Sequence, residues 1–564
     1  MAIPTLPRIQ RAVKSIRRGQ EVIRVLFRHG FSETVRETGL ARWAKDHLQM
    51  DLLIEEQSDS HLSRNQRIRR VLEDLGPIFI KIGQMLSTRP DLLAPDLVEE
   101  LKKLQSDVAP VPFARIKEAL VQEFGDRLST LFSSIDPNSI GAASLAQTHR
   151  AKLVTGESVV LKILRPGIRS QLETDISILR EIARLSESRF SNLGFSPLEV
   201  CAEFTAELER EIDYLREASS TERLASLFLS DPGINFPKVY RHACTGSVLT
   251  LEEIDGILIS HCTPSMLDKT TRRNVVENAT RAVFKQCLEF GFFHADPHPG
   301  NIFIVGDGAI CFVDCGMTGH LEERTSQDIA RLSNGIVNSD LDEIIDVIRS
   351  LTSADPALMR SRSFRNDLWQ LVSQFQQGTL ESLNVGSLLS EFFSLLRRYH
   401  IRCPSDLVYL IKSLTTIESV AASIDPSFDL ITYVQPYLER LIRRRYSAKA
   451  LANRARRATA GYLELLEDLP SNLKNLIEQL LNDRFQVHLE HRGLHDLTDT
   501  LIVVGKKLSS AVTLAALLVG SSILILADAL KGTGPTIASA IGAIGYAISS
   551  AAALSSMIAF WRGK

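Results

Sequence analysis

The fold of this chain is decided by HADPHPGN at residues 294–301, followed by FVDCG at residues 312–316. The two segments present a carboxylate at Asp296, an amide at Asn301 and a second carboxylate at Asp314. The handling of MgATP requires such a set. One Asp orients or deprotonates the acceptor hydroxyl, an Asn binds the metal, and a second Asp bridges the metal to the phosphates. We therefore expect ATP and Mg²⁺ as cofactors, with Asn301 and Asp314 as the metal ligands.

The surrounding residues follow the order found in protein kinases. His294 precedes Asp296 by two positions and Asn301 follows it by five, as in the kinase catalytic loop. Asp307-Gly308 is a hairpin-turn signal between two strand-like runs, and it comes before the Asp-x-Gly at residues 314–316. A catalytic loop, a hairpin and then Asp-x-Gly predict the larger lobe of a kinase-like fold.

An upstream lysine completes this set. Lys162 lies within VVLKIL, an apolar run typical of a β-strand. A lysine that faces inward from such a strand needs a partner, and ATP phosphates together with a helix carboxylate would supply it. Two pairs of candidate carboxylates, each with members four residues apart, follow in a helical segment: Glu207 with Glu211, and Asp213 with Glu217. Spacing alone does not choose among them.

The segment before this lysine departs from the ordinary kinase pattern. Residues 140–147 are IGAASLAQ, where ordinary kinases carry a glycine-rich loop. One glycine remains, and alanines take the other places. Because alanine resists the positive φ angles that glycine adopts freely, we expect a stiffer loop that approaches phosphates differently. Its expected nucleotide-binding residues are Gly141, Ala142, Ala143 and Ser144.

Two charge-free apolar runs occupy the C-terminus, at residues 508–527 and 536–560. Each is long enough to cross a hydrocarbon core of about 30 Å. The second run is rich in small residues, and Gly542 and Gly545 are expected where the two helices meet. Basic residues flank the pair on both sides, which predicts that both ends and the N-terminal body are cytoplasmic. A buried helical hairpin of a soluble domain is the alternative.

Composition excludes several other classes of protein. The 564 residues carry a net charge of −2, which argues against a generally basic nucleic-acid binder. The 7 cysteines form no CxxC pair, which fits a reducing compartment without structural zinc. Residues 1–30 are rich in Arg and Lys and do not have the pattern of a signal peptide. Their apolar positions have near-helical spacing and predict a helix that lies on an anionic membrane or has a solvated face.

Together these residues resemble the UbiB family of atypical, protein-kinase-like proteins, also called the AarF or ADCK family. Lys81-Ile82-Gly83-Gln84 looks like the family's KxGQ signature, which ordinary kinases lack. The alanine-rich loop replaces the glycine-rich one, as in that family. Glu211-Ile212-Asp213, with Glu217 following, looks like its ExD motif and helix glutamate. The paired C-terminal runs also resemble those of bacterial UbiB proteins.

The resemblance implies a role for each residue of the nucleotide site. Lys162 would contact the phosphates and pair with Glu217, although Glu211 stays open as an alternative helix glutamate. Asp296 would be the catalytic-loop aspartate, so that Asp296, Lys162 and Glu217 form the expected catalytic set. Glu252 and Glu253, at the end of VLTLEE, fall where a hinge would meet adenine through backbone groups.

The resemblance also implies a regulatory extension over the active site. Lys81, Gly83 and Gln84 would lie above the cleft, with Lys81 paired to Glu211 or to Asp213. In the family this extension occludes the place where a protein substrate would bind. These five residues are therefore expected to regulate the site rather than to perform its chemistry.

We expect an α+β, protein-kinase-like two-lobed fold with an N-terminal helical KxGQ extension and a C-terminal transmembrane helical hairpin. The expected segments run in order along the chain. They are a basic helical segment (1–60), the KxGQ extension (61–130), an N-lobe with the alanine-rich loop (131–255), a helical C-lobe with the catalytic loop (256–505) and a two-helix anchor (506–564).

The sequence thus predicts a membrane-anchored atypical kinase or ATPase that supports isoprenoid quinone (ubiquinone) biosynthesis from the inner membrane. Expected partners are ATP, membrane lipids or quinone-pathway intermediates that it acts on or extracts, and quinone-biosynthesis enzymes, with no nucleic acid. A protein kinase that phosphorylates other proteins is one alternative, although the KxGQ extension argues against an open substrate groove. A nucleotide-switched scaffold for lipid-pathway enzymes is the other.

Overall fold

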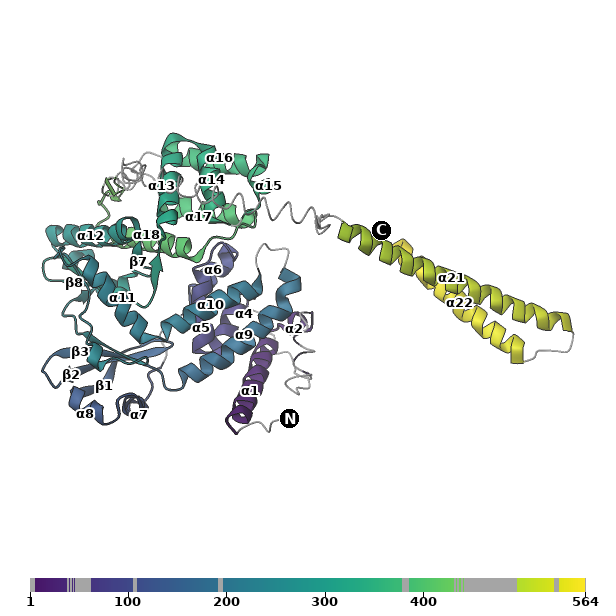
Figure 1. Ribbon diagram of the computed structural model, residues 1–564, viewed down its shortest axis with the longest axis horizontal. Coiled ribbons are helices and arrows are strands. Elements are labelled where there is room, and N and C mark those ends of the chain that lie inside the picture. The colour runs from purple at the N-terminus through teal and green to yellow at the C-terminus, as the bar shows by residue number, and fades with distance from the viewer. Residues whose placement is uncertain are drawn as a thin grey trace, which may run out of the picture. The chain divides into compact units, whose positions relative to one another are not determined.

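The computed structural model divides the chain into two compact units, Met1–Arg454 and Ala455–Lys564. The larger unit mixes helices and sheets, as predicted, and carries every expected site residue (Figure 1). The smaller unit contains the apolar C-terminal runs. The structure describes residues 6–37, 62–104, 109–190, 196–352, 354–377, 385–430, 494–531 and 537–562, with single residues at 40, 43, 45, 433, 436, 437 and 440.

The smaller lobe of the larger unit is built on a four-stranded antiparallel sheet in the order β1-β2-β3-β5. Alternate residues of β3 are buried against a helix, α7, on one face, so Lys162 lies on the opposite face of the strand. The helix α8 leads into the sheet. The bounds are α7 Phe113–Phe124, α8 Leu128–Leu131, β1 Phe132–Ala142, β2 Ala146–Leu153, β3 Ser158–Leu164 and β5 Val248–Glu252.

Helices that come before and after the first three strands in the sequence pack together beside the sheet (Figure 1). Ile78 and Ile82 of the KxGQ helix, α5, share an apolar core with Leu208 of α10 and Leu249 of β5. The KxGQ segment is therefore an integral part of this lobe. The helices are α4 Arg64–Leu75, α5 Pro77–Ser87, α6 Pro95–Leu101, α9 Ile168–Phe190, α10 Pro197–Glu211 and α11 Tyr214–Leu227.

The helical segment that carries the candidate carboxylates breaks between Glu211 and Tyr214. Asp213 has extended backbone angles, φ −106° and ψ 91°, and its side chain accepts hydrogen bonds from the backbone N–H groups of Leu215 and Arg216. It is thus the N-cap of α11, a position that favours Asp. The expectation that Asp213 and Glu217 lie on one face of a continuous helix is wrong, because Asp213 ends the break and Glu217 lies in the first turn of the new helix.

Two small sheets hold the catalytic segment in the larger lobe. One has the order β4-β9-β8-β6, and in the other β7 pairs with β10. The hairpin predicted around Asp307-Gly308 is formed by β8 and β9, and Gly308 takes the positive φ of 101° that the turn requires. The strands are β4 Ile234–Asn235, β6 Ile257–Leu258, β7 Phe292–His294, β8 Ile302–Val305, β9 Ala309–Phe312 and β10 Thr318–His320.

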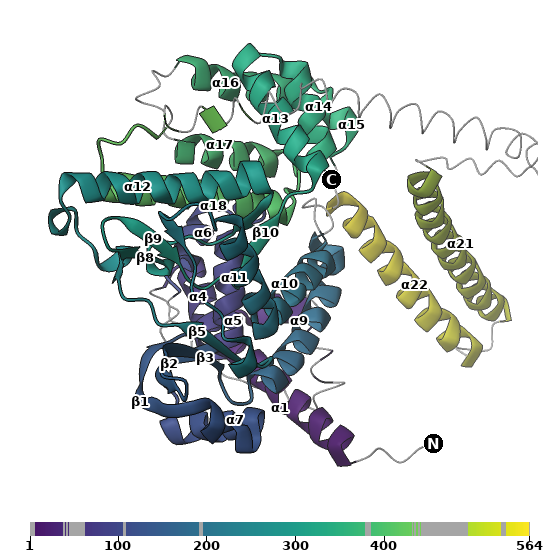
Figure 2. The ribbon, with the colours of Figure 1, turned by 60° about the vertical axis from the view of Figure 1, so that its left-hand side comes forward.

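Helices make up the rest of the larger lobe. The helix α18 is long and apolar enough to cross a membrane by composition, but Ile417, Val420 and Ala421 are buried in a core shared with α12. Figure 2 shows α12 lying along α18, so α18 is a core helix of this lobe. The helices are α12 Lys269–Phe284, α13 Glu323–Asn338, α14 Leu341–Leu351, α15 Pro356–Met359, α16 Arg362–Gln377, α17 Val385–Arg398 and α18 Ser405–Ile424.

The basic N-terminal helix, α1 Leu6–Arg28, packs on the smaller lobe and is followed by α2 Ser32–Glu37. Ile23 is buried and Leu26 packs with it, and the guanidinium of Arg18 pairs with the buried Asp175 of α9 at 2.7 Å. The apolar side chains of the last turns of α1 therefore face the protein. This result excludes them from the membrane contact that was one of the two expectations for this helix.

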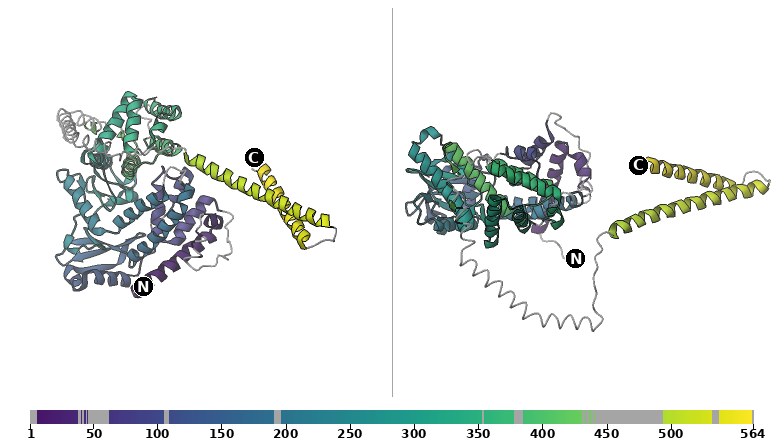
Figure 3. Two further views of the ribbon diagram at one scale, coloured as in Figure 1. Left: turned by 45° about the vertical axis from the view of Figure 1, so that its right-hand side comes forward. Right: turned by 90° about the horizontal axis from the view of Figure 1, so that it is seen from above.

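The second unit is a helical hairpin of α21 Leu494–Lys531 and α22 Ile537–Arg562, which lie side by side (Figures 1 and 3). A Cβ atom at Gly542 would lie 3.0 Å from the carbonyl oxygen of Ser521, and one at Gly545 would lie 2.6 Å from its hydroxyl. Both glycines thus lie at the helix contact, as predicted. By length and composition Leu508–Leu526 is able to cross a membrane, and among the residues of α22 whose side chains the structure describes, Ala540–Ala552 form a shorter apolar stretch.

Candidate active site

Lys162 and Glu217 form the centre of the site. The ammonium of Lys162, on β3, donates to both carboxylate oxygens of Glu217, on α11, at 2.9 Å each. It also lies 5.5 Å from the centre of the Tyr214 ring. Glu217 is buried, and burial raises its pKa to about 7 although the nearby ammonium opposes this. These contacts select Glu217 over the other candidate carboxylates as the partner of Lys162.

Asp314 is held by the same lysine in an uncommon backbone conformation. Its φ of 56° lies in the left-handed region, which non-glycine residues seldom adopt, and such conformations gather at functional sites. Its Oδ1 accepts from Lys162 at 2.6 Å. Desolvation opposes ionisation of this half-exposed carboxyl, but the Lys162 ammonium outweighs it and holds the pKa of Asp314 well below its usual range. Asp314 is therefore a carboxylate at neutral pH.

The catalytic-loop segment is fixed by the buried imidazole of His294. Its Nδ1 accepts from the backbone N–H of Asp296 at 3.1 Å, and its Nε2 lies 3.1 Å from the carbonyl oxygen of Val313. Burial lowers the pKa of His294, so the ring is neutral and its Nε2–H donates to Val313. This side chain ties the loop of Asp296 to the strand that leads into Asp314.

Asn301 and Asp314 provide oxygen ligands that suit Mg²⁺. The side-chain Nδ2 of Asn301 donates to the Asp296 carbonyl oxygen at 3.2 Å, which turns its amide oxygen the other way. Mg²⁺ prefers hard oxygen ligands and commonly takes only one or two from the protein beside substrate phosphates. One amide oxygen and one carboxylate fit that preference. No cluster of three His, Cys, Asp or Glu side chains suited to a metal occurs in the part of the chain that the structure describes.

The KxGQ residues lie beside these groups. Lys81 forms an ion pair with Glu211, and Gln84 donates to the carbonyl oxygen of Leu104 at 3.2 Å. A Cβ atom at Gly83 would lie 2.3 Å from a methyl carbon of Leu104 and 2.8 Å from one of Leu72, so these two side chains pack directly against the glycine. Of the two partners left open for Lys81, Glu211 is the one that it contacts, because Asp213 caps α11.

The alanine-rich loop lies only partly in the cavity wall. Ala143 and Ser144 line the cavity, whereas Gly141 and Ala142 do not. Its conformation is held by a hydrogen bond from the Ala143 N–H to the Ala146 carbonyl oxygen, at 2.9 Å. The guanidinium of Arg165 also donates to the Ala143 carbonyl at 2.8 Å. The loop is thus pinned by its own backbone and by a cation.

The two expected hinge residues lie outside the cavity wall. The backbone N–H of Glu252 donates to the Lys238 carbonyl oxygen at 2.9 Å, and that of Glu253 donates to Ser158 at 3.2 Å. The Glu253 carboxylate pairs with Arg150. Because both N–H groups are already bonded within the protein, neither is free to meet an adenine ring. The sequence carried no signal for this, since backbone pairing depends on the strand register.

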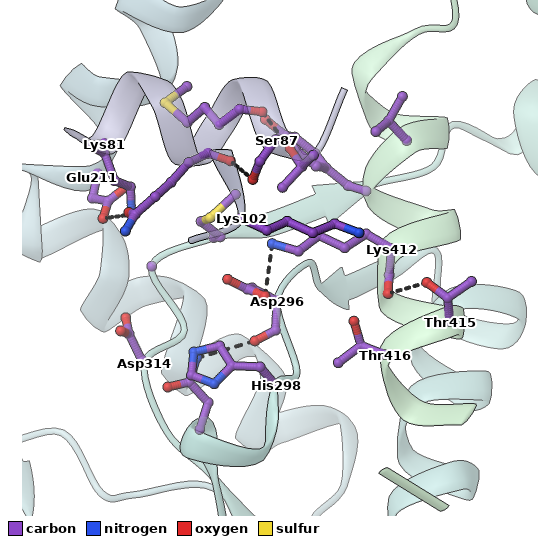
Figure 4. Close-up of a pocket in the computed structure, with 18 of the residues that line it drawn as sticks. Lys81, Ser87, Lys102, Glu211, Asp296, His298, Asp314, Lys412, Thr415 and Thr416 are labelled. Atoms are coloured by element: carbon purple, nitrogen blue, oxygen red, sulfur yellow. Dashed lines mark hydrogen bonds and ion pairs between the residues drawn. The ribbon is translucent and has the colours of Figure 1, made fainter. Parts of the chain in front are cut away.

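The charged residues of the site line one cavity of about 860 Å³. One wall of this cavity, formed by α18, could not be recognised from the sequence. The ammonium of Lys412, on α18, contacts the Oδ1 of Asp296 at 2.9 Å. Figure 4 shows Lys412 reaching Asp296 from α18, with Lys81 and Glu211 on the opposite side of the view. The only signal in the sequence is a lysine within an otherwise apolar helical run, LVYLIKSL.

The body of this chain matches two family models. A model of the ABC1 atypical kinase-like domain matches residues 103–348, and a model of the UbiB helical domain matches residues 369–429. With the geometry above, these matches define an atypical kinase-like protein.

Full-length relatives narrow this class to one family. The chain is 32% identical over 432 residues to a probable protein kinase UbiB of Pseudomonas fluorescens, across 76% of this chain and 79% of the relative. This chain therefore belongs to the UbiB family, as its motifs indicated. It is also 28% identical over 475 residues to an uncharacterized protein from the hydrogenase 1 5′ region of Clostridium pasteurianum, across 83% and 88% of the two chains. A solved structure of Rv3197 with erythromycin, from Mycobacterium tuberculosis, is 19% identical with a TM-score of 0.44, and covers 72% of this chain and 98% of its own.

Proposed function

We propose that this protein is a membrane-anchored, MgATP-dependent ATPase or small-molecule kinase that supports isoprenoid quinone biosynthesis. One observation carries the proposal. Five residues from four segments, each of a type that MgATP chemistry uses, line one cavity: Lys162, Glu217, Asp314, Asp296 and Asn301. Each has the chemical type that phosphoryl transfer requires.

The protein's own residues divide this chemistry between them. Lys162, positioned by Glu217, is the cation for the ATP phosphates, and Asp296 orients the acceptor and takes its proton. Asn301 and Asp314 would hold Mg²⁺, which supplies charge neutralisation of the phosphates when bound. Asp314 shares Lys162 with Glu217, so the three charges are arranged before any ligand binds.

Substitution of Asp314 tests this proposal. We expect Asp314→Asn to lower ATP turnover about 100-fold or more while the protein stays folded, because the metal-binding carboxylate is removed. Turnover of purified full-length protein is measured in detergent or lipid, with circular dichroism as the check on folding. Undiminished turnover in this variant would contradict the proposal.

A protein acceptor is the second candidate, since relatives are named as probable protein kinases. The walls of the cavity argue against it. Residues of α5 and α6, among them Met85, Ser87 and Val98, line the cavity. A protein substrate would have to displace them. Labelled ATP added to a cell extract distinguishes the two: sustained transfer to protein would favour the kinase.

The membrane and quinone parts of the proposal rest on the apolar hairpin and on the family. The mostly exposed apolar side chains of Leu508–Leu526 would enter the inner membrane, with the kinase-like body on the cytoplasmic side. Lipids or quinone intermediates would then be within reach of the active site. A quinone profile of cells that lack the protein, rescued with wild type or with Asp314→Asn, tests this part, and a normal profile without the protein would contradict it.

A further inference from the structure

The helix α18 contacts the catalytic-loop segment at two neighbouring residues. Lys412 pairs with the Asp296 carboxylate at 2.9 Å, and the fully buried hydroxyl of Ser413 donates to the His294 carbonyl oxygen at 2.9 Å. In the sequence, Lys412 lies 116 residues after Asp296, and Ser413 lies 119 residues after His294. They come from the segment that matches the UbiB helical domain.

Lys412 is a charged residue in an otherwise apolar part of α18, so its charge needs an explanation. The α18 helix is otherwise apolar where it enters the core, and the Lys412 side chain is only 24% exposed. A cation in such surroundings is costly unless it is paired. Its ion pair is with Asp296, whose side chain is 26% exposed and faces the same cavity. The Lys412 ammonium therefore serves the Asp296 carboxylate and does not serve to stabilise the helix.

The loop of Asp296 has no cation of its own. HADPHPGN contains no Lys or Arg, and the Nδ1 of His298 accepts from the Gly300 N–H at 3.0 Å. The other lysines that line the cavity are paired elsewhere: Lys162 with Glu217 and Asp314, Lys81 with Glu211, and Lys102 with Glu99.

These observations assign a task to Lys412. We infer that Lys412, supplied by the helical domain, is the positioning residue of the catalytic aspartate: it fixes the direction of the Asp296 carboxylate beside the acceptor. This inference rests on the function proposed above. It adds that the helical domain completes the active site, so that the ABC1 domain alone holds an incomplete one.

The reaction that Lys412 would serve is balanced as follows. The acceptor oxygen, of water or of an alcohol, forms a bond to the γ-phosphorus of ATP. The bond from that phosphorus to ADP breaks, and its electron pair leaves on ADP. The acceptor's proton passes to Asp296 and then to solvent. Lys412 acts on this step only through the Asp296 carboxylate, while Lys162 stays on the nucleotide side.

The test is a kinetic double-mutant cycle on the full-length protein. Wild type, Lys412→Gln, Asp296→Asn and the double variant are compared for kcat and for the KM of MgATP. We expect Lys412→Gln to lower kcat at least about 10-fold with an unchanged KM, since Lys412 does not touch the nucleotide side. In the Asp296→Asn background the same substitution should cost nothing further, because its partner is already gone.

Controls separate a positioning role from a structural one. Lys412→Arg keeps the charge and should restore part of kcat, and Lys269→Gln, at an exposed lysine on α12, should leave it unchanged. Thermal melting of every variant shows whether it is folded, and Lys412→Met replaces Lys412→Gln if the latter is not. An equal loss of kcat in both backgrounds, or normal turnover in Lys412→Gln, overturns the inference. A wild type that does not turn over ATP, or is indifferent to Asp314→Asn, overturns the proposed function as well, so the two failures are distinguishable.

Discussion

The two walls of the cavity differ in how they are built. The wall formed by β3 and α11 brings Lys162, Glu217 and Asp314 together in a charged triad that is assembled from recognisable motifs. The α18 wall supplies a single lysine, Lys412, to Asp296 from a helix without any motif. The difference teaches that the wall with Lys162 can be predicted from the sequence. The α18 wall cannot, because it depends on which distant helix packs against the catalytic loop.

The largest effect is expected when the first wall loses its cation. Lys162→Met leaves Glu217 and Asp314 facing each other without a counter-charge. It should destabilise the protein by about 4 kcal/mol and raise the KM of MgATP. Thermal melting and steady-state kinetics measure both. Lys412→Gln, which leaves only one carboxylate without its cation, is the matched comparison. It should cost less stability and leave KM unchanged. Equal stability losses in the two variants would contradict the distinction between the walls.

A smaller effect is expected from the titration of Glu217. Its pKa in the folded protein is about 7, raised by burial above the value of about 4.3 usual for Glu. The folded state therefore binds this proton more tightly than the unfolded state. The stabilising contribution is full below about pH 4 and is lost as the pH rises through 7, a change of about 3 kcal/mol. Wild type should thus lose stability relative to Glu217→Gln between pH 5 and 8, as followed by urea unfolding. Parallel pH curves for the two proteins would show that this carboxyl titrates normally.

The smallest effect is expected at the second contact of α18. Ser413→Ala removes the hydrogen bond to the His294 carbonyl, which is a neutral bond in a fully buried place. Such a bond contributes about 1 kcal/mol, so the melting temperature should fall by a few degrees and turnover should fall only slightly. The exposed Ser226→Ala, on α11, is the control. A loss of turnover as large as that of Lys412→Gln would place the main function of this wall in Ser413 instead.

Much of this site could be predicted because its motifs are local. The spacing of Asp296 and Asn301 and the hairpin before Asp314 are set within a few residues of each other, and the structure has the same order. Lys162 could be found because a lysine is unusual in an apolar strand. In each case the signal and the structure that it predicts lie within one element or one turn.

The remainder depends on tertiary packing. The sequence places Asp213 four residues before Glu217, but an N-cap there breaks the helix and turns Asp213 away from Lys81. Backbone pairing of Glu252 and Glu253 depends on the register of neighbouring strands, which composition does not set. Lys412 is more than a hundred residues from Asp296, and no local pattern links the two. Contacts of that kind appear only when the helices have packed.

The binding of MgATP to the purified full-length chain tests the central claim most directly, that Lys162, Asn301 and Asp314 form one nucleotide and metal site. Calorimetry of wild type and of Asp314→Asn is compared with and without Mg²⁺. We expect wild type to bind ATP more tightly when Mg²⁺ is present and Asp314→Asn to lose this dependence. Identical Mg²⁺ dependence in the two proteins, or no binding of ATP by wild type, would contradict it.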